Sequence, residues 1–148
     1  MSRFEPWIAL GMLVAVSPLL GCGQKPHADK HAQPAQVEPI EGLDLSRVTY
    51  TEHAMKRIDV HTTAITKETS QRSDTPQAVV PHSAIIYDPH GKTWVYTSPE
   101  PRVFVRAQVN VDHISNDKVY LIKGPEPGTT VVTVGVVEIY GTEFHVGH

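Results

Sequence analysis

The 148-residue chain contains a single cysteine, Cys22, so an internal disulfide cannot form and this residue needs another explanation. Basic residues are also few, with 13 Lys and Arg against 16 Asp and Glu and a formal net charge of −3. The sequence has no stripe of basic residues, which a nucleic-acid-binding surface would need. We therefore expect no nucleic acid among the partners of this chain.

The sequence also has no apolar run long enough to cross a membrane as a helix. The longest one, from Trp7 to Leu20, falls short of the roughly 20 residues that a transmembrane helix needs. A short apolar run that follows a basic residue, here Arg3, is instead typical of a secretory signal. This pattern predicts a signal peptide at residues 1–21 and a location outside the cytoplasm.

The end of this run, Leu19-Leu20-Gly21-Cys22, resembles the lipobox of bacterial lipoproteins. The resemblance implies cleavage before Cys22 and a covalent lipid on its thiol, with no other cofactor. Several acyl chains hold a protein stably on a membrane, whereas a single chain does so only marginally. We expect a membrane anchor facing the periplasm or the cell exterior. The alternative is a plain secretory signal or an uncleaved anchor, with Cys22 incidental.

Motifs for catalysis are missing as well. The sequence contains no Gly-x-Ser-x-Gly and no glycine-rich phosphate loop. His82 and Ser83 are adjacent, and adjacent residues of a strand point to opposite faces, so they would not form a catalytic pair. We therefore expect that the chain is not an enzyme.

What the sequence does contain divides into a polar segment and a β-rich one. Residues 22–42 are rich in Pro, Ala and Gln and carry too little apolar surface to offset the entropy of ordering, which predicts a flexible tether. Residues 43–148 predict a small, mainly β domain, roll-like or barrel-like, with at most one short helix. The helix is expected at residues 51–57, a polar loop at residues 66–77 and a turn at residues 115–117. Residues 136–140 fit either a last strand or a short helix.

The clearest β signals lie in the middle of this domain. Residues 84–97 predict a hairpin around a turn at Asp88–Lys92, in which Gly91 can adopt a positive φ. Residues 103–111 alternate strictly, with valines and Ala107 on one face and polar residues plus Phe104 on the other. Phe104 is thus expected to face outward, and with Trp94 and Tyr96 it is a candidate contact for a protein partner.

Five short motifs carry a family resemblance. The segments 80–88, 91–96, 109–111, 124–132 and 135–140 follow in order the pattern of the last, membrane-proximal domain of the periplasmic adaptors, or membrane fusion proteins, of resistance-nodulation-division efflux systems. A weaker similarity covers residues 48–65. Asp112 and Pro125 depart from the pattern, which has glycine and leucine at these positions.

A complete adaptor of this family carries a lipoyl-like domain and a long helical hairpin where this chain has only residues 66–77. The chain therefore resembles a truncated adaptor. In the family this end of the protein contacts the inner-membrane transporter. The resemblance thus implies an accessory, adaptor-like component of an efflux or transport system with that transporter as partner.

A second interpretation starts from the nine histidines. Imidazole is a common ligand for zinc and copper, and His145 and His148 lie three residues apart near the end of the sequence. They are the candidate metal ligands, although a real site needs three or four converging groups. This leaves open a stand-alone metal-binding or ligand-binding lipoprotein, periplasmic or extracellular.

Overall fold

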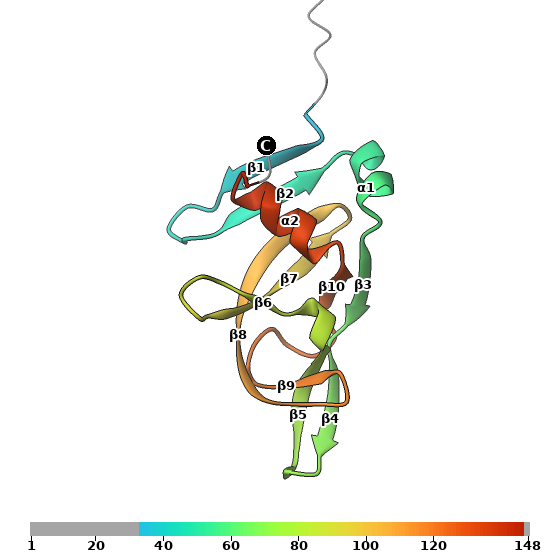
Figure 1. The fold of residues 1–148 in the computed structure, drawn as a ribbon, viewed down its shortest axis with the longest axis vertical. Coiled ribbons are helices and arrows are strands. Elements are labelled where there is room, and N and C mark those ends of the chain that lie inside the picture. The colour runs from blue at the N-terminus through green and yellow to red at the C-terminus, as the bar shows by residue number, and fades with distance from the viewer. Residues whose placement is uncertain (1–32, 147–148) are drawn as a thin grey trace, which may run out of the picture. The chain divides into compact units, whose positions relative to one another are not determined.

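The computed structural model describes residues 33–146, which form a mainly β domain, as the sequence predicts (Figure 1). The signal peptide, Cys22 and most of the expected tether lie outside these residues. Within them, the strands are β1 (Ala35–Pro39), β2 (Ser46–Tyr50), β3 (His61–Ala64), β4 (Thr66–Ser70), β5 (Ser73–Pro81), β6 (Ile86–Tyr87), β7 (Thr93–Glu100), β8 (Val103–Ser115), β9 (Lys118–Lys123) and β10 (Thr130–Val134).

Two short α-helices and one 3₁₀ turn accompany these strands, where at most one helix was expected. They are α1 (Glu52–Ile58), η1 (His82–Ala84) and α2 (Val136–Glu143). The expected helix is confirmed as α1: the Thr51 hydroxyl accepts a hydrogen bond from the Ala54 N–H at 3.2 Å, which caps its first turn. α2 occupies a segment whose sequence was compatible with a strand or a helix.

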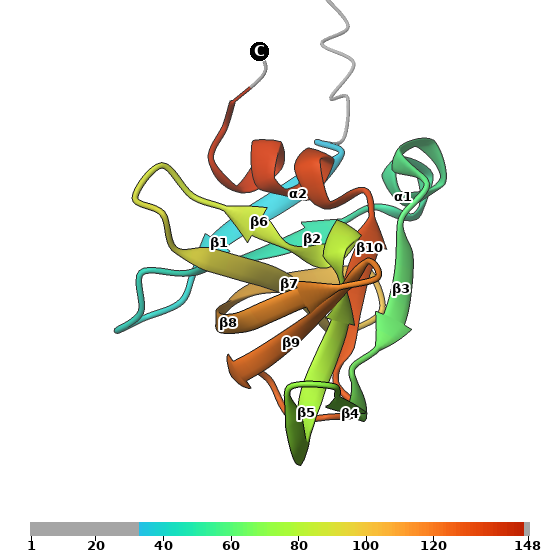
Figure 2. The same cartoon turned by 60° about the horizontal axis from the view of Figure 1, so that its bottom comes forward.

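The strands form one strongly curved antiparallel sheet in the order β3-β10-β7-β8-β9-β5-β4, with β1 and β2 attached alongside β8 (Figures 1 and 2). The long strand β8 produces much of the curvature. Its first half pairs with β7 and β2, and its second half pairs with β9 after register shifts around Val111. Such irregularities bend a strand and increase its twist, so β8 turns the sheet through a corner.

Ile65 links the two ends of this sheet. It lies between β3 and β4, and it exchanges backbone hydrogen bonds of 2.9 and 2.8 Å with Thr129 and Gly128. The continuous segment 61–70 thus pairs with β10 through its first half and with β5 through its second half. The curved sheet encloses one hydrophobic core, made of Ile65, Val80, Ala84, Val95, Val109, Val119, Leu121 and Val131.

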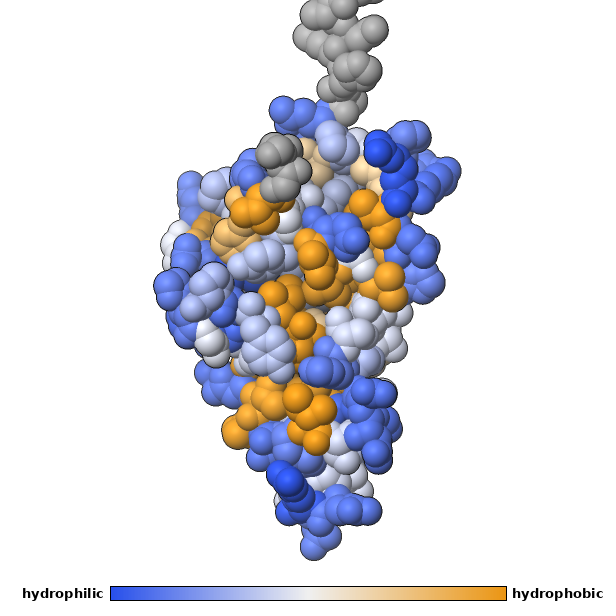
Figure 3. Space-filling view, in the orientation of Figure 1, coloured by the Kyte–Doolittle hydropathy of each residue, from blue (hydrophilic) through white to orange (hydrophobic). Residues whose placement is uncertain are grey.

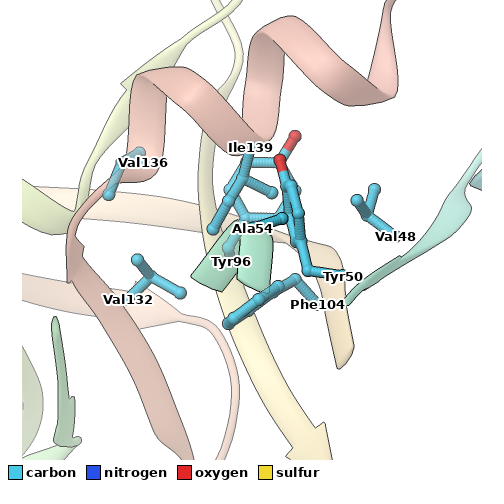
Figure 4. Close-up of a cluster of buried hydrophobic side chains, with 8 residues drawn as sticks. All are labelled: Val48, Tyr50, Ala54, Tyr96, Phe104, Val132, Val136 and Ile139. Atoms are coloured by element: carbon cyan, nitrogen blue, oxygen red, sulfur yellow. The ribbon is translucent and has the colours of Figure 1, made fainter. Parts of the chain in front are cut away.

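A second core lies on the opposite face of β7 and β8, beneath α2. Figure 4 shows its members converging between the helix and the sheet: Val48, Tyr50, Ala54, Tyr96, Phe104, Val132, Val136 and Ile139. The prediction that Phe104 faces outward is therefore wrong, since only 1% of its surface is exposed. The first half of β8 thus contributes to both cores, one enclosed by the curved sheet and the other covered by α2.

Two boundaries also differ from the sequence prediction. The expected loop at residues 66–77 instead belongs to the hairpin β4–β5. Lys118 Nζ of β9 donates a hydrogen bond of 2.6 Å to Glu68 Oε2 of β4, which attaches the hairpin to β9. This hydrogen bond has the largest influence on the pKa of Glu68 and lowers it below its ordinary value. The expected tether, residues 22–42, contains β1, which pairs with β2 over its whole length. The folded domain thus begins before residue 43.

The predicted turns are confirmed. Tyr87 pairs with Thr93 across the turn at residues 88–92, where Gly91 has φ +76°. The turn between β8 and β9 places both Asn116 and Asp117 at positive φ, 50° and 60°. Two consecutive residues of this kind are typical of a tight hairpin turn whose twist matches its strands.

Candidate functional site

The three predicted partner contacts occupy different environments. Tyr96 is 0% exposed and Phe104 is 1% exposed, so both belong to the core under α2. Neither can touch a partner while the domain stays folded. Trp94 is only half-buried and remains a candidate contact.

Trp94 lines a surface pocket of about 530 Å³. Four parts of the chain build it: the loop between β1 and β2, the turn between β6 and β7 with the start of β7, the strand β8, and α2 with the residue after it. We call it the Arg106 pocket; its lining residues are Leu43, Asp44, Leu45, Asp88, Pro89, His90, Lys92, Trp94, Arg106, Gln108, Tyr140 and Phe144.

The Arg106 side chain lies between two aromatic rings of this pocket. Its guanidinium carbon is 4.1 Å from the centre of the Trp94 ring and 4.9 Å from the centre of the Phe144 ring. Both distances are within the range of a cation–π interaction, and a planar guanidinium stacks well on aromatic faces. One Arg106 amino group also donates to the Asp44 carbonyl at 3.4 Å, which connects the β1–β2 loop to the pocket.

Glu143 of α2 neutralises Arg106. Arg106 Nε lies 3.3 Å from the Glu143 carboxylate, and the two side chains are only 7% and 3% exposed. The Tyr96 hydroxyl donates a hydrogen bond to the same carboxylate. Burial, and next this bond to Glu143, raise the pKa of Tyr96 above its ordinary value, so Tyr96 stays a neutral donor.

Asp88 fixes the position of Trp94. One carboxylate oxygen of Asp88 accepts hydrogen bonds from the backbone N–H groups of His90 and Lys92, both at 2.9 Å. The other oxygen accepts a hydrogen bond from Trp94 Nε1–H at 3.0 Å. Partial desolvation opposes ionisation, but the hydrogen bonds from Trp94, Lys92 and His90 outweigh it and lower the pKa of Asp88. The turn and the indole ring are thus held together by one ionised side chain.

This arrangement suits recognition. Trp, Tyr and Arg are the residue types that most often dominate the binding energy of protein interfaces, and here they lie together around one recess with exposed Leu43 and Phe144 at its rim. Arg106, which lines the pocket, is already paired with Glu143. Sequence reasoning found Trp94 but missed Arg106, Glu143 and Phe144, which come together only through the packing of α2.

The predicted metal ligands are described only in part. His145 follows the end of α2, is exposed and has φ 53°, whereas His148 lies outside the described residues. Among residues 33–146, no three His, Cys, Asp or Glu side chains converge in the manner of a metal site. Two histidine side chains there each pair with one carboxylate, His61 with Asp59 at 3.1 Å and His113 with Asp112 at 3.0 Å.

Neither helix of residues 33–146 has the length and apolarity that crossing a membrane would require. No protein-family model matches the chain, and no curated protein matches it as a relative. The resemblance to efflux adaptors thus remains a prediction that depends on the motifs named above.

Proposed function

We propose that this protein is a membrane-anchored, non-catalytic lipoprotein that serves as an accessory, adaptor-like component of an efflux or transport system. Its anchor is the lipid on Cys22, and its partner is a transporter in the same membrane. The Arg106 pocket is the surface that contacts this partner.

The observation that carries the proposal is the association of Trp94, Phe144 and Arg106 in one open pocket on a rigid support. Asp88 fixes the indole, and Glu143 fixes the guanidinium, so both side chains are held in place before a partner arrives. Side chains that are ordered in advance lose less entropy on binding. The five motifs that resemble the adaptor family support the same proposal, because all of them fall within this one folded domain.

Co-purification from the native host tests the proposal. Cells expressing the tagged protein are crosslinked, their membranes are solubilised, and the recovered proteins are identified by mass spectrometry. Three chains are compared: the unchanged protein, Cys22→Ala and Trp94→Ala. We expect a transporter subunit with the unchanged protein, and its loss or strong reduction with each variant.

The control variant is Tyr87→Ala. Tyr87 is an exposed aromatic residue of the same hairpin, with 57% of its surface accessible, but it does not line the pocket. Circular dichroism of all variants checks that they fold. Recovery of the same transporter subunit from all four chains would contradict the assigned surface, and recovery of none would contradict the function.

A further inference from the structure

A second recess runs along the other side of α2, between this helix and β1. Its volume is about 760 Å³ and its lining is mostly apolar, with Ala35 and Val37 of β1 facing Val137 and Tyr140 of α2. Tyr50 contributes to its lining, and the Tyr50 hydroxyl donates to Thr142 Oγ1 at 2.6 Å. The phenol is therefore satisfied within the domain and offers mainly its ring to the recess.

Two apolar side chains at the edge of this recess are exposed. Val137 is 78% exposed and Val146 is 60% exposed. Figure 3 shows apolar residues over α2 on the visible face of the domain. We call Val137, Tyr140 and Val146 the α2 face. Exposed apolar residues beside a mostly apolar recess are a candidate contact with another surface.

The position where the chain enters the domain indicates which surface this is. Gln33 and Pro34, the first described residues, line the same recess. Eleven peptide steps separate Cys22 from Gln33. Even fully extended, they span at most about 40 Å. A lipid on Cys22 would therefore keep this end of the domain near the bilayer, whereas the β4–β5 hairpin lies at the opposite end of the domain (Figures 1 and 2).

We infer that the α2 face rests on the lipid bilayer, with Val137 and Val146 entering the interfacial region. This inference depends on the lipid anchor of the proposed function. Valine and tyrosine side chains suit the interface between acyl chains and head groups. The exposed Arg57 of α1, at the same end of the domain, would lie near anionic head groups, whereas the neighbouring Lys56 pairs with Glu52 at 2.8 Å (Figure 1).

The orientation also fits the proposed partner. The Arg106 pocket lies on the other side of α2 and shares Tyr140 with the recess. When the α2 face contacts lipid, this pocket opens sideways, just above the membrane surface. A protein embedded in the same bilayer could then reach Trp94 and Phe144.

Depth-dependent fluorescence quenching tests this orientation on the full lipoprotein. The only native cysteine would be blocked by its lipid, so an introduced thiol accepts a fluorophore selectively. We would label Val137→Cys, Val146→Cys and Ile122→Cys, and reconstitute each protein into vesicles that contain nitroxide-labelled lipids. Ile122 is the matched control, since it is also an exposed apolar residue, at 69%, but belongs to β9 near the far end of the domain.

We expect quenching at positions 137 and 146 to exceed quenching at position 122 by more than about threefold, because an apolar face in the interface is buried about 5–10 Å into the boundary between head groups and acyl chains. Equal quenching at all three positions, or stronger quenching at position 122, would overturn the inference. Vesicle flotation and intact mass are measured on the same samples. A protein that neither floats nor carries the lipid mass contradicts the anchor itself, whereas a lipidated protein without the quenching difference contradicts only the orientation.

Discussion

Arg106 on β8 and Glu143 at the end of α2 form an ion pair that is almost completely buried, although 37 residues separate them in the sequence. The pair attaches α2 to the sheet, and its Arg106 also lines the pocket assigned to partner binding. Arg106 therefore links the stability of the domain to its proposed binding surface. Unfolding experiments measure the first property, and partner recovery measures the second.

Replacing either partner of this ion pair should destabilise the domain strongly. Arg106→Met leaves a buried carboxylate without its cation, and Glu143→Gln leaves a buried guanidinium without its anion. Each should lower the free energy of unfolding by about 3–5 kcal/mol, measured by urea denaturation. The double variant should lose clearly less than the sum, because neither charge is then left unpaired.

The control for this cycle is an exposed pair. Arg47 and Glu100 are 3.8 Å apart, with side chains that are 45% and 66% exposed. Arg47→Met should therefore change the free energy of unfolding by less than about 1 kcal/mol. If the Arg106 and Glu143 variants behave like Arg47→Met, the buried pair does not hold α2 in place.

The turn that orients Trp94 should respond to acid. Because the pKa of Asp88 is lower in the folded than in the unfolded state, the unfolded state binds more protons between the two values. The stabilisation is complete above the unfolded pKa of about 3.9 and is lost as the pH falls through the folded pKa. Asp88→Asn should be less stable than the unchanged protein at neutral pH, and this difference should shrink in acid. Chemical denaturation across the pH range measures it; a difference independent of pH would show that ionised Asp88 is not responsible.

Gly135, the residue before α2, should not tolerate a side chain. Its φ is +83°, and an added Cβ would lie 2.9 Å from Val60 Cγ2 and 3.4 Å from the Ile58 carbonyl oxygen. Gly135→Ala combines this steric conflict with the cost of a left-handed conformation, about 1–2 kcal/mol. Gly91→Ala is the matched control, with a similar φ of +76° and no atom within 4 Å of the added Cβ. We expect thermal unfolding to show a clearly larger loss for Gly135→Ala; equal losses would mean that the packing at Val60 is unimportant.

The turn between β8 and β9 offers a stabilising substitution. Asp117 adopts a φ of 60°, which costs free energy for a residue with a Cβ and none for glycine. Asp117→Gly would create the Asn-Gly pair that such turns favour, and the Asp117 carbonyl that accepts the His82 N–H would be kept. We expect the free energy of unfolding to rise by up to about 1 kcal/mol, measured by urea denaturation. A loss of stability would show that the Asp117 side chain has a role of its own.

The sequence predicts those parts of this fold that depend on local patterns. The hairpin around Asp88–Lys92 has turn residues between two β-branched segments, and α1 has a capping threonine followed by an acidic first turn. Both signals lie within a few residues of the structure they produce, which is why both predictions are confirmed.

The errors concern features that depend on distant contacts. Phe104 follows the outward half of an alternating pattern, but α2, which begins 32 positions later in the sequence, covers that face. β4 and the first half of β5, up to residue 77, are polar because they form the exposed part of a hairpin, and polar composition alone resembles a loop. β1 contains a single valine, so its composition resembles that of a tether. Its strand conformation depends on the pairing with β2, which the local sequence does not reveal.

The candidate site was predictable to the same limited extent. Trp94 could be found because it lies in a recognisable hairpin, whereas Arg106 and Glu143 have no local signal that they are buried together. The sequence pattern at residues 136–140 was compatible with a strand or a helix. Without the helix, the pocket has no second wall and Phe144 has no position beside Arg106.

Site-specific photo-crosslinking in the native host tests the central claim most directly. A photoreactive amino acid is placed at His90, an exposed residue at the rim of the Arg106 pocket, or at Gln71, an exposed residue of the turn between β4 and β5. Each version is also made with Cys22→Ala. Our account predicts that irradiation links position 90, and not position 71, to a membrane transporter subunit, and that this product disappears without the anchor. The absence of such a product at position 90, or equal capture at position 71, would contradict it.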